Sequence, residues 1–448
     1  MTRRAITIAA LSLPALLAAI AAPVSSAQGV SAARPVFVPG QVVVRLEGQR
    51  AGRALRLPAG VGVRDAARAL RRNPRVAYAV PNYVATASAA LPNDPGTPPG
   101  TAGQSGGWVK KQWNFLPCGA LCYGPTAKAQ FESLGGIDAI GAWRNLAAAG
   151  RRGAPGVRVA VLDTGIAYRS LQSGRIRFRR SPDFAADQFA VGYDFVRNDP
   201  IGLDENGHGT HVAGTIGERT GNGVGVTGLA YRAKLLPVRV LNALGRGQSD
   251  DIARGIRFAA DHGADVINMS FNFSCGAQVK PVAAAVRYAH KKGSVLVASA
   301  GNIGSETCVS PPATLPDVIG VAGTTEGACL GDYSLTGEDI DLSAPGGGTP
   351  SAACPSSSAR PIFQVTLRGT STVSFGLPNQ FVGTSMAAAH VSGVAAMVIA
   401  SGALGTSPTP DEVAQRLKAT ARDLGTPGRD PNYGAGLIDA ARATDPAL

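Results

Sequence analysis

Charged residues are scarce in this chain: they make up 16% of its 448 residues, against 45% hydrophobic residues. Disordered chains have the opposite balance, so this composition predicts a folded protein with at least one large core. Beyond residue 27 we find no apolar run long enough to cross a membrane, which predicts a soluble product without a membrane partner. No pair of its six cysteines has the spacing of a zinc ribbon.

The N-terminus has the pattern of a secretory signal peptide. Arg3 and Arg4 precede the apolar run Ala5–Ala22, and small residues follow in Val24–Ala27. We therefore expect residues 1–27 to be a signal peptide and the product to be secreted, either extracellular or periplasmic in transit. The length of the run leaves an uncleaved anchor as the alternative, and the arginine pair leaves both the general and the twin-arginine export routes open.

Six cysteines in an exported chain permit three disulfide bonds, because an oxidising destination disfavours free thiols. Counting alone allows fifteen connectivities. The order of the cysteines along the chain favours pairing between neighbours, which predicts Cys118–Cys122, Cys275–Cys308 and Cys329–Cys354.

The net charge of +13 is concentrated near the N-terminus. Residues 34–75 contain ten Arg against Glu47 and Asp65, a net charge of +8, and Arg3 and Arg4 add +2. Only +3 remains for the rest of the chain. Because we expect the basic segments to be removed, the charge does not predict a nucleic-acid partner.

Residues 28–90 have the pattern of a small α+β unit. Strand patterns at Val36–Leu46 and Val76–Val84 flank a helical pattern at Val63–Arg72. The Ala-, Ser-, Pro- and Gly-rich segment Thr86–Gly107 is typical of an exposed linker, which proteases cut easily.

Residues 91–448 alternate strand patterns with helical patterns. The strand patterns are Val157–Leu162, Lys234–Leu241, Val266–Met269, Val295–Ser299 and Val318–Ala322, and the helical patterns include Asp250–His262 and Val279–Lys292. The alternation predicts an α/β fold with a mostly parallel sheet flanked by helices on both faces. Ligand sites in such sheets lie at the carboxyl ends of the strands, so functional residues should follow strands.

Three short motifs carry the side chains of a nucleophilic site. Asp163 follows a strand pattern, His208 and His211 open an apolar helix, and Ser385 follows a Gly-Thr turn at the start of a longer apolar helix. A serine hydroxyl becomes a good nucleophile only beside an imidazole base and a carboxylate that orients the base. The chain supplies all three groups.

Each of these residues has another interpretation when it is taken alone. Asp163 would be a turn residue, or half of an aspartic protease pair, but the sequence has no second Asp-Thr-Gly or Asp-Ser-Gly. The histidine pair would bind a metal, but it lacks the Glu of a His-Glu-x-x-His helix. Ser385 alone would be a helix N-cap, and the Gly-x-Ser-x-Gly elbow of an esterase is absent around it.

Together the three motifs resemble the signatures of the subtilisin-like serine proteases, the subtilase family. The matching segments are Asp163-Thr164-Gly165, His208-Gly209-Thr210-His211 and Gly383-Thr384-Ser385-Met386-Ala387. The similarity extends from about Asn93 to Ala443. It implies an endopeptidase in which Ser385 attacks the scissile carbonyl, His208 accepts and returns the proton, and Asp163 orients His208.

The resemblance also implies binding residues. Asn302 would donate its amide to the oxyanion beside the Ser385 backbone N–H. The implied peptide-binding residues lie in two edge segments and one turn: Gly245, Arg246, Gly247, Ser270, Phe271, Asn272 and Gly301. Backbone pairing of this kind ignores sequence, so we expect broad specificity, and Ile303 would make the primary pocket more apolar.

The segment before residue 91 resembles the inhibitory propeptide of these proteases, through Val38–Gln41 and Asn73–Asn82. The resemblance implies that residues 28–90 template folding and inhibit the enzyme until self-cleavage near Ala85–Leu91. The expected partners of a monomeric enzyme are then this propeptide and protein or peptide substrates.

Asp residues cluster ahead of His208, as in the oxygen-rich loops that bind Ca²⁺ or in an ordinary solvated surface. The resemblance supports one structural Ca²⁺ site through Asp183 and Asn222, with Val224 and Val226 of the same loop. A second site would use Asp194 and Asp199. Arg197 and Leu203 stand where related proteases have oxygen ligands for that second site.

A catalytically silent secreted binding protein on the same scaffold is the alternative function. Such a protein would normally have lost at least one catalytic residue. This chain retains Asp163, His208, Ser385 and Asn302.

Overall fold

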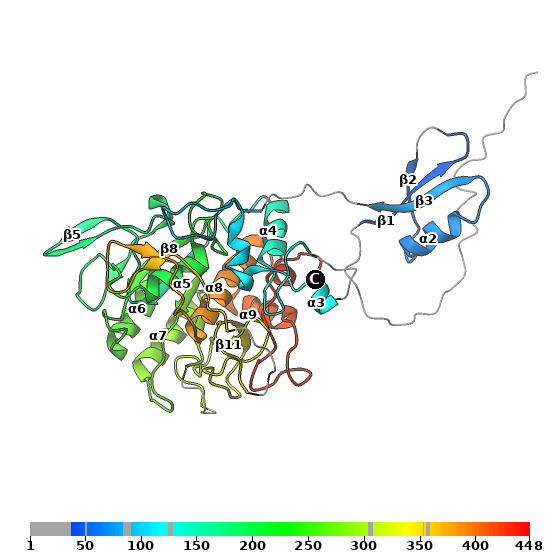
Figure 1. Ribbon diagram of the computed structural model, residues 1–448. Helices are drawn as coiled ribbons and strands as arrows, with labels where there is room; N and C mark the ends of the chain where they lie inside the picture. Colours follow the sequence, from blue (N-terminus) through cyan, green and yellow to red (C-terminus); the bar gives the residue numbers. More distant parts are fainter. Residues whose placement is uncertain are drawn as a thin grey trace, which may run out of the picture. The chain divides into compact units, whose positions relative to one another are not determined.

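The computed structural model describes residues 37–49, 52–83, 91–123, 129–302, 308–352, 354 and 359–448. The chain divides into two compact units, residues 1–89 and 90–448 (Figure 1). The expected signal peptide, Ile303 and most of the expected cleavage segment lie outside the described residues.

The N-terminal unit is a three-stranded antiparallel sheet with one helix. The strands β1 (Phe37–Leu46), β2 (Arg53–Arg56) and β3 (Val76–Tyr83) are ordered β2-β1-β3, and α2 (Val63–Leu70) packs on them. The buried residues of α2 recur at spacings of three and four along the helix, which gives it one apolar face. The sequence predicted β1, α2 and β3, but not β2, whose residues are mostly exposed and lack an apolar alternation.

The second unit contains a seven-stranded parallel sheet, which confirms the predicted fold class. Its order is β12-β11-β10-β9-β4-β8-β7. The strands along the chain are β4 (Arg158–Asp163), β7 (Tyr193–Asp194), β8 (Lys234–Arg239), β9 (Val266–Met269), β10 (Val295–Ser299), β11 (Val318–Thr324) and β12 (Leu342–Pro345). The five predicted strands are all present, whereas β7, with two residues, and β12, which ends in a proline, were not predicted.

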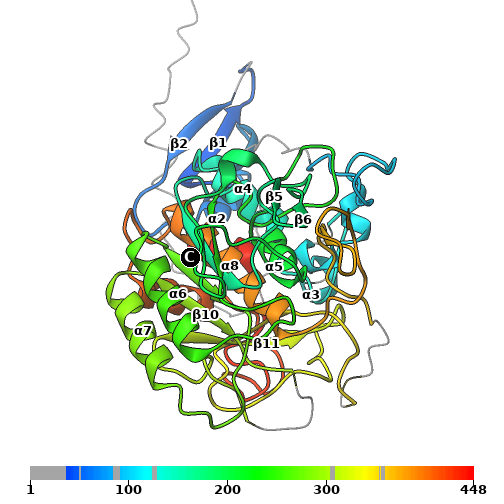
Figure 2. The ribbon, with the colours of Figure 1, turned by 90° about the vertical axis from the view of Figure 1, so that its left-hand side faces the viewer.

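Helices cover both faces of this sheet (Figure 2). On one face α5 (His208–Gly217) and α8 (Thr384–Ser401) pack with α4 (Ala139–Ala148) and α9 (Pro410–Thr420); on the other lie α6 (Ser249–Asp261) and α7 (Lys280–Lys291). Alternate residues of β4 enter the two cores: Val159 and Val161 face α5 and α8, while Ala160 and Leu162 face α6 and α7. A strand buried on both faces explains the continuous apolar run that predicted it.

Shorter elements complete the second unit. They are η1 (Gly107–Lys110), η2 (Trp113–Phe115), α3 (Ala120–Tyr123), the hairpin β5 (Leu171–Ser173) and β6 (Ile176–Phe178), η4 (Ala186–Gln188), the pair β13 (Thr366–Leu367) and β14 (Phe375–Gly376), and α10 (Ala440–Ala443).

The helix α8 corrects one expectation. Its 18 residues are long and apolar enough for a membrane span, although we expected no such run beyond residue 27. Inside the protein 89% of this span is buried, so α8 is the central helix of the core. No other helix in the described ranges meets the same criterion.

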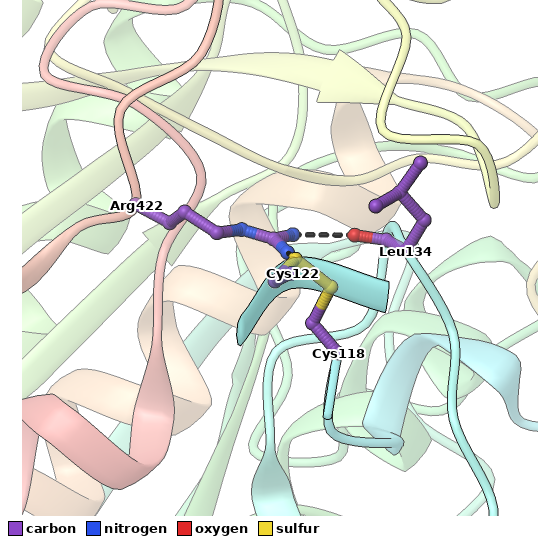
Figure 3. The surroundings of a disulfide bond; sticks show 4 residues. All are labelled: Cys118, Cys122, Leu134 and Arg422. Atoms are coloured by element: carbon purple, nitrogen blue, oxygen red, sulfur yellow. Dashed lines mark hydrogen bonds between the residues drawn. A yellow bond between two sulfur atoms is a disulfide. The ribbon is translucent and has the colours of Figure 1, made fainter. Parts of the chain in front are cut away.

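All three disulfides join neighbouring cysteines, as predicted: Cys118–Cys122, Cys275–Cys308 and Cys329–Cys354. The last two close loops of 33 and 25 residues, long enough to stabilise the fold by about 3–4 kcal/mol each if chain entropy dominates. The first lies against Arg422, whose guanidinium donates to Cys122 Sγ and to the Leu134 carbonyl (Figure 3). This contact ties α3 to a C-terminal segment.

Candidate active site

The predicted site residues meet at the carboxyl edge of the parallel sheet. Asp163 ends β4, His208 begins α5, and Ser385 lies in the first turn of α8. The strand β4 lies where the strand order reverses, with β8 and β7 on one side and β9 to β12 on the other. A crevice is expected at this point of an open parallel sheet.

A cleft of about 680 Å³ occupies this position. Its lining residues are Thr164, Asn206, His208, Leu241, Gly245, Arg246, Gly247, Ile252, Ser270, Phe271, Asn272, Phe273, Asn302 and Ser385. Six of the seven predicted peptide-binding residues are among them. Gly301 is not; its N–H donates to Thr384 Oγ1 and its carbonyl accepts from Leu335 N.

The carboxylate of Asp163 holds the His208 ring. His208 Nδ1 lies 2.8 Å from Asp163 Oδ1, which also accepts from Thr164 N at 2.7 Å. Asp163 is fully buried, whereas the His208 side chain is 26% exposed. An Nδ1–H donated to a buried carboxylate leaves His208 Nε2 without the proton, so this nitrogen can act as a general base.

Asp204 positions the loop that carries His208. Its buried carboxylate accepts hydrogen bonds from Thr164 Oγ1, from the N–H groups of Asn206, Gly207 and Thr210, and from Thr210 Oγ1. These donors lie on both sides of His208, so Asp204 joins the end of β4 to the start of α5. The sequence analysis treated Asp204 only as one of the Asp residues ahead of His208. Thr210, whose N–H and hydroxyl both donate to Asp204, could have indicated that this carboxylate caps the start of α5.

Gly209 permits α5 to approach β4. A Cβ at this position would lie 2.1 Å from the Gly165 carbonyl oxygen and 3.0 Å from Asp163 Cβ. Any side chain would therefore push the helix, and with it His208, away from Asp163.

The electrostatics of the pair stabilise the protonated form of the His208 imidazole. Burial alone lowers the pKa of the His208 imidazole, but the charge and hydrogen bond of Asp163, with the charge of Asp204, outweigh it and raise the pKa above its usual value of 6.5. Asp163 therefore makes His208 a stronger base than an ordinary histidine.

Ser385 faces the cleft from the N-terminus of α8. Its Oγ donates to the Ser270 carbonyl at 3.1 Å, and Ser270 Oγ donates back to the Ser385 carbonyl at 2.8 Å. The hydroxyl thus hydrogen-bonds the backbone that follows β9 rather than His208. Bonds between nucleophile and base often tighten only when substrate binds.

Asn302 presents an amide donor next to Ser385. Its Oδ1 accepts from Thr384 N at 2.9 Å and from Thr384 Oγ1 at 2.8 Å, which fixes the side chain by its oxygen and leaves Nδ2 available. The first N–H groups of α8 lack helical partners, and the helix dipole is positive at this end. Asn302 Nδ2 and the Ser385 N–H can therefore stabilise a negatively charged oxygen.

His211 has a structural environment. Its Nε2 lies 3.0 Å from the Ile362 carbonyl and its ring stacks on Phe381 with centroids 4.1 Å apart. Burial lowers the pKa of His211 to about 3, so the ring is neutral. The Ile362 carbonyl at Nε2 and the stacked Phe381 ring thus account for His211 as a structural neighbour of His208.

The structure brings Asp183 into contact with the loop of the first predicted calcium site. Asp183 accepts from Asn222 Nδ2 at 2.7 Å and from Val226 N at 3.2 Å, and the carbonyls of Val224 and Val226 accept none of the backbone hydrogen bonds described. Asp94, which the sequence analysis missed, accepts from three N–H groups of the same loop, Gly221 to Gly223.

The carboxylates around this loop are buried close together, and the charge of Arg219 offsets only part of the effect on Asp183. Burial, and to a lesser extent the charge of Asp94, raise the pKa of Asp183 well above its usual range. The pKa of Glu218 is likewise raised by burial and by Asp183, and its buried Oε1 has no partner among the described residues. No cluster of three His, Cys, Asp or Glu in the described ranges could hold a metal. Asp183, one amide and backbone carbonyls nonetheless form the hard oxygen set that Ca²⁺ prefers.

The second predicted calcium site does not fit a cation. The buried Arg239 guanidinium donates to Asp194 Oδ2 at 3.2 Å and to Glu205 Oε2 at 2.8 Å, and Arg197 donates to the same Glu205 oxygen at 2.6 Å. Asp199 Oδ1 accepts from Ile201 N. Two arginines thus supply the positive charge that a metal ion would bring, and the prediction of a metal at Asp194 and Asp199 is not supported.

Comparison with known proteins places these features in a family. A sequence model of the subtilase family matches residues 154–436. The chain is 37% identical over 289 residues to a thermostable alkaline protease of Halalkalibacterium halodurans, covering 64% of this chain and 68% of that protein. It is 32% identical over 367 residues to a thermophilic serine proteinase of a Bacillus species, covering 82% of this chain and 73% of that protein.

A solved structure shares the fold as well. A protease from Pseudoalteromonas arctica superposes with a TM-score of 0.60 at 30% sequence identity, covering 79% of this chain and 99% of that chain.

Proposed function

Because this chain belongs to the subtilase family, we propose that Asp163, His208 and Ser385 are the catalytic triad of this serine endopeptidase. The observation that supports the assignment best is the 2.8 Å contact between His208 Nδ1 and the buried Asp163 Oδ1, in the cleft that Ser385 also lines. An oriented imidazole base beside a serine at a helix N-terminus is the arrangement that acyl transfer requires.

In the acylation step the Ser385 hydroxyl gives its proton to His208 Nε2 as Oγ bonds to the scissile carbonyl carbon. Asp163 stabilises the imidazolium, and Asn302 Nδ2 and the Ser385 N–H bind the carbonyl oxygen as it becomes negative. The C–N bond then breaks, and His208 returns the proton to the leaving amine. Water repeats the sequence on the acyl-enzyme and regenerates Ser385.

We also propose that the enzyme is made as a secreted zymogen. Residues 1–27 would be the signal peptide, residues 28–90 an inhibitory propeptide released by self-cleavage, and residues 91–448 the monomeric peptidase domain. The charged signal pattern and the separate compact unit before residue 90 support this organisation. Backbone recognition by Gly245–Gly247 and Ser270–Asn272 would give broad specificity with an apolar preference.

The function is tested first at the oxyanion donor. Asn302→Leu should lower kcat by about 10²–10³-fold with little change in KM, which is the loss known when this donor is removed from a subtilisin. Asn302→Asp keeps the oxygen that binds Thr384 but removes the amide donor, so it should be impaired as well. Peptide hydrolysis under saturating substrate measures kcat. A normal kcat in Asn302→Asp would contradict the proposed donor.

One structural calcium ion is proposed at Asp183, Asn222 and the carbonyls of Val224 and Val226, where it would neutralise the buried carboxylates. Excess Ca²⁺ should raise the midpoint of thermal unfolding by several degrees over a chelator-treated sample. Asp183→Asn should abolish this difference, whereas Asp199→Asn should retain it, since Asp199 lies outside this loop. Identical unfolding curves with and without Ca²⁺ would remove the proposal.

A further inference from the structure

The cleft contains one permanently charged side chain among its described lining residues. Arg246 lines the cleft together with the apolar side chains of Leu241, Ile252, Phe271 and Phe273, here called the apolar section. His208 is the only other residue with an ionisable side chain of the kind found in Asp, Glu, His, Lys or Arg among the described lining residues. A substrate in this section therefore meets an apolar surface with a single cation beside it.

The backbone of Arg246 is held in place before substrate binds. Asn242 Oδ1 accepts from Leu244 N at 2.9 Å and from Arg246 N at 3.1 Å, and Asn242 N donates to the Arg246 carbonyl at 2.9 Å. A Cβ on Gly247 would lie 2.4 Å from the Val240 carbonyl oxygen, so the turn packs closely against the residues that follow β8. Little backbone freedom is lost when Arg246 engages a ligand.

The Arg246 side chain is exposed and makes no hydrogen bond or ion pair with the described residues. Other arginines near the cleft are already neutralised: Arg197 and Arg239 by Glu205, and Arg254 by Asp251. The charge of Arg246 is therefore free to act on a substrate.

We propose that Arg246 selects an acidic side chain, Asp or Glu, at one position of the substrate close to the scissile bond. The inference rests on the proposed peptidase function and names a preference within its broad specificity. A guanidinium matches a carboxylate with two parallel N–H donors, and a substrate that covers the apolar section also shields the pair from water.

The expected self-cleavage segment does not contain such a residue. No Asp or Glu occurs between Asp65 and Asp94. Self-cleavage therefore does not require the ion pair, and the preference should appear in substrates other than the propeptide.

The experiment compares peptides that differ only by Glu or Gln, placed in turn at each of the four residues before and three after the cut. For the wild type, kcat/KM for the Glu peptide should exceed that for the Gln peptide by about fivefold at one position, which is the gain expected from a partly exposed ion pair. This ratio should fall at high salt, because salt screens the attraction between the two charges. In Arg246→Ala the ratio should fall to about one, and in Arg246→Glu it should invert. The ratio cancels any change in overall activity.

Arg151→Glu is the matched control, because it makes the same change of charge on an exposed loop ahead of β4, at the sheet edge opposite Asp163. It should retain the wild-type ratio. A ratio near one at every position of the wild type, or a preference that survives Arg246→Ala, would overturn the inference. If the wild type cleaves none of the peptides, the proposed function fails instead.

Discussion

Ser385→Ala should lower kcat for peptide hydrolysis by about 10⁶-fold, the loss known for the triad serine of a subtilisin. The variant retains the Asp163–His208 pair, the Asn302 amide and the cleft, but it lacks the atom that forms the acyl bond. What remains is the activity due to binding and oxyanion stabilisation alone. The same variant should stay at precursor size, because the proposed cleavage of the propeptide uses the same serine. Casein hydrolysis and the mass of the purified chain measure the two effects.

Ser401→Ala is the matched control for this experiment. Ser401 ends the same helix, and its Oγ donates to the Val398 carbonyl at 2.8 Å, away from the cleft lining. This variant should mature and hydrolyse casein. Adding a trace of active enzyme should convert the Ser385→Ala precursor, which separates a catalytic defect from misfolding. Unaided maturation and casein hydrolysis by Ser385→Ala would refute the assignment of the nucleophile.

Asp163→Asn should lower kcat by about 10⁴-fold at neutral pH, while the fold is retained. The Asn amide can donate to His208 Nδ1, which places the remaining ring proton on Nε2, the nitrogen that must accept from Ser385. A carboxylate also stabilises the imidazolium as it forms, and a neutral amide does not.

The pH profile gives a second test of this carboxylate. His208 must be neutral to act as the base, and Asp163 raises the pKa of His208, so the acid limb of the wild-type kcat/KM profile should lie above the usual histidine value of 6.5. Without that charge the burial of the ring lowers the pKa of His208, so the acid limb of Asp163→Asn should move to lower pH. An unchanged limb in this variant would show that Asp163 does not set the titration of the base.

Local patterns explain why much of the architecture could be predicted. The strands β4, β8, β9, β10 and β11 are buried on both faces, so each left a continuous apolar run. The proposed catalytic residues directly follow such runs or begin apolar helices, and the parallel arrangement brings these ends to one edge. The pairing of neighbouring cysteines likewise followed from their order.

Long-range partners could not be predicted. Arg239 and Asp194 are 45 residues apart and meet because β8 pairs with β7, a strand of two residues. Nothing local marks an arginine as the partner of a particular carboxylate, so the sequence suggested a metal there. Asp94 accepts hydrogen bonds from the Gly221–Gly223 loop, which is 127 to 129 residues away in the sequence. No local sequence pattern near either segment predicts this contact.

The sequence by itself determined the class of fold and the chemical identity of the proposed catalytic groups, because these depend on short motifs and on burial patterns along single elements. The tertiary structure decided which charges face one another: Asp204 against the His208 loop, two arginines at the second predicted calcium site, and Arg246 in the cleft lining without a partner among the described residues. Such pairings depend on how distant segments pack, and the residues next to a charged side chain in the sequence do not identify the partner that it meets in the fold.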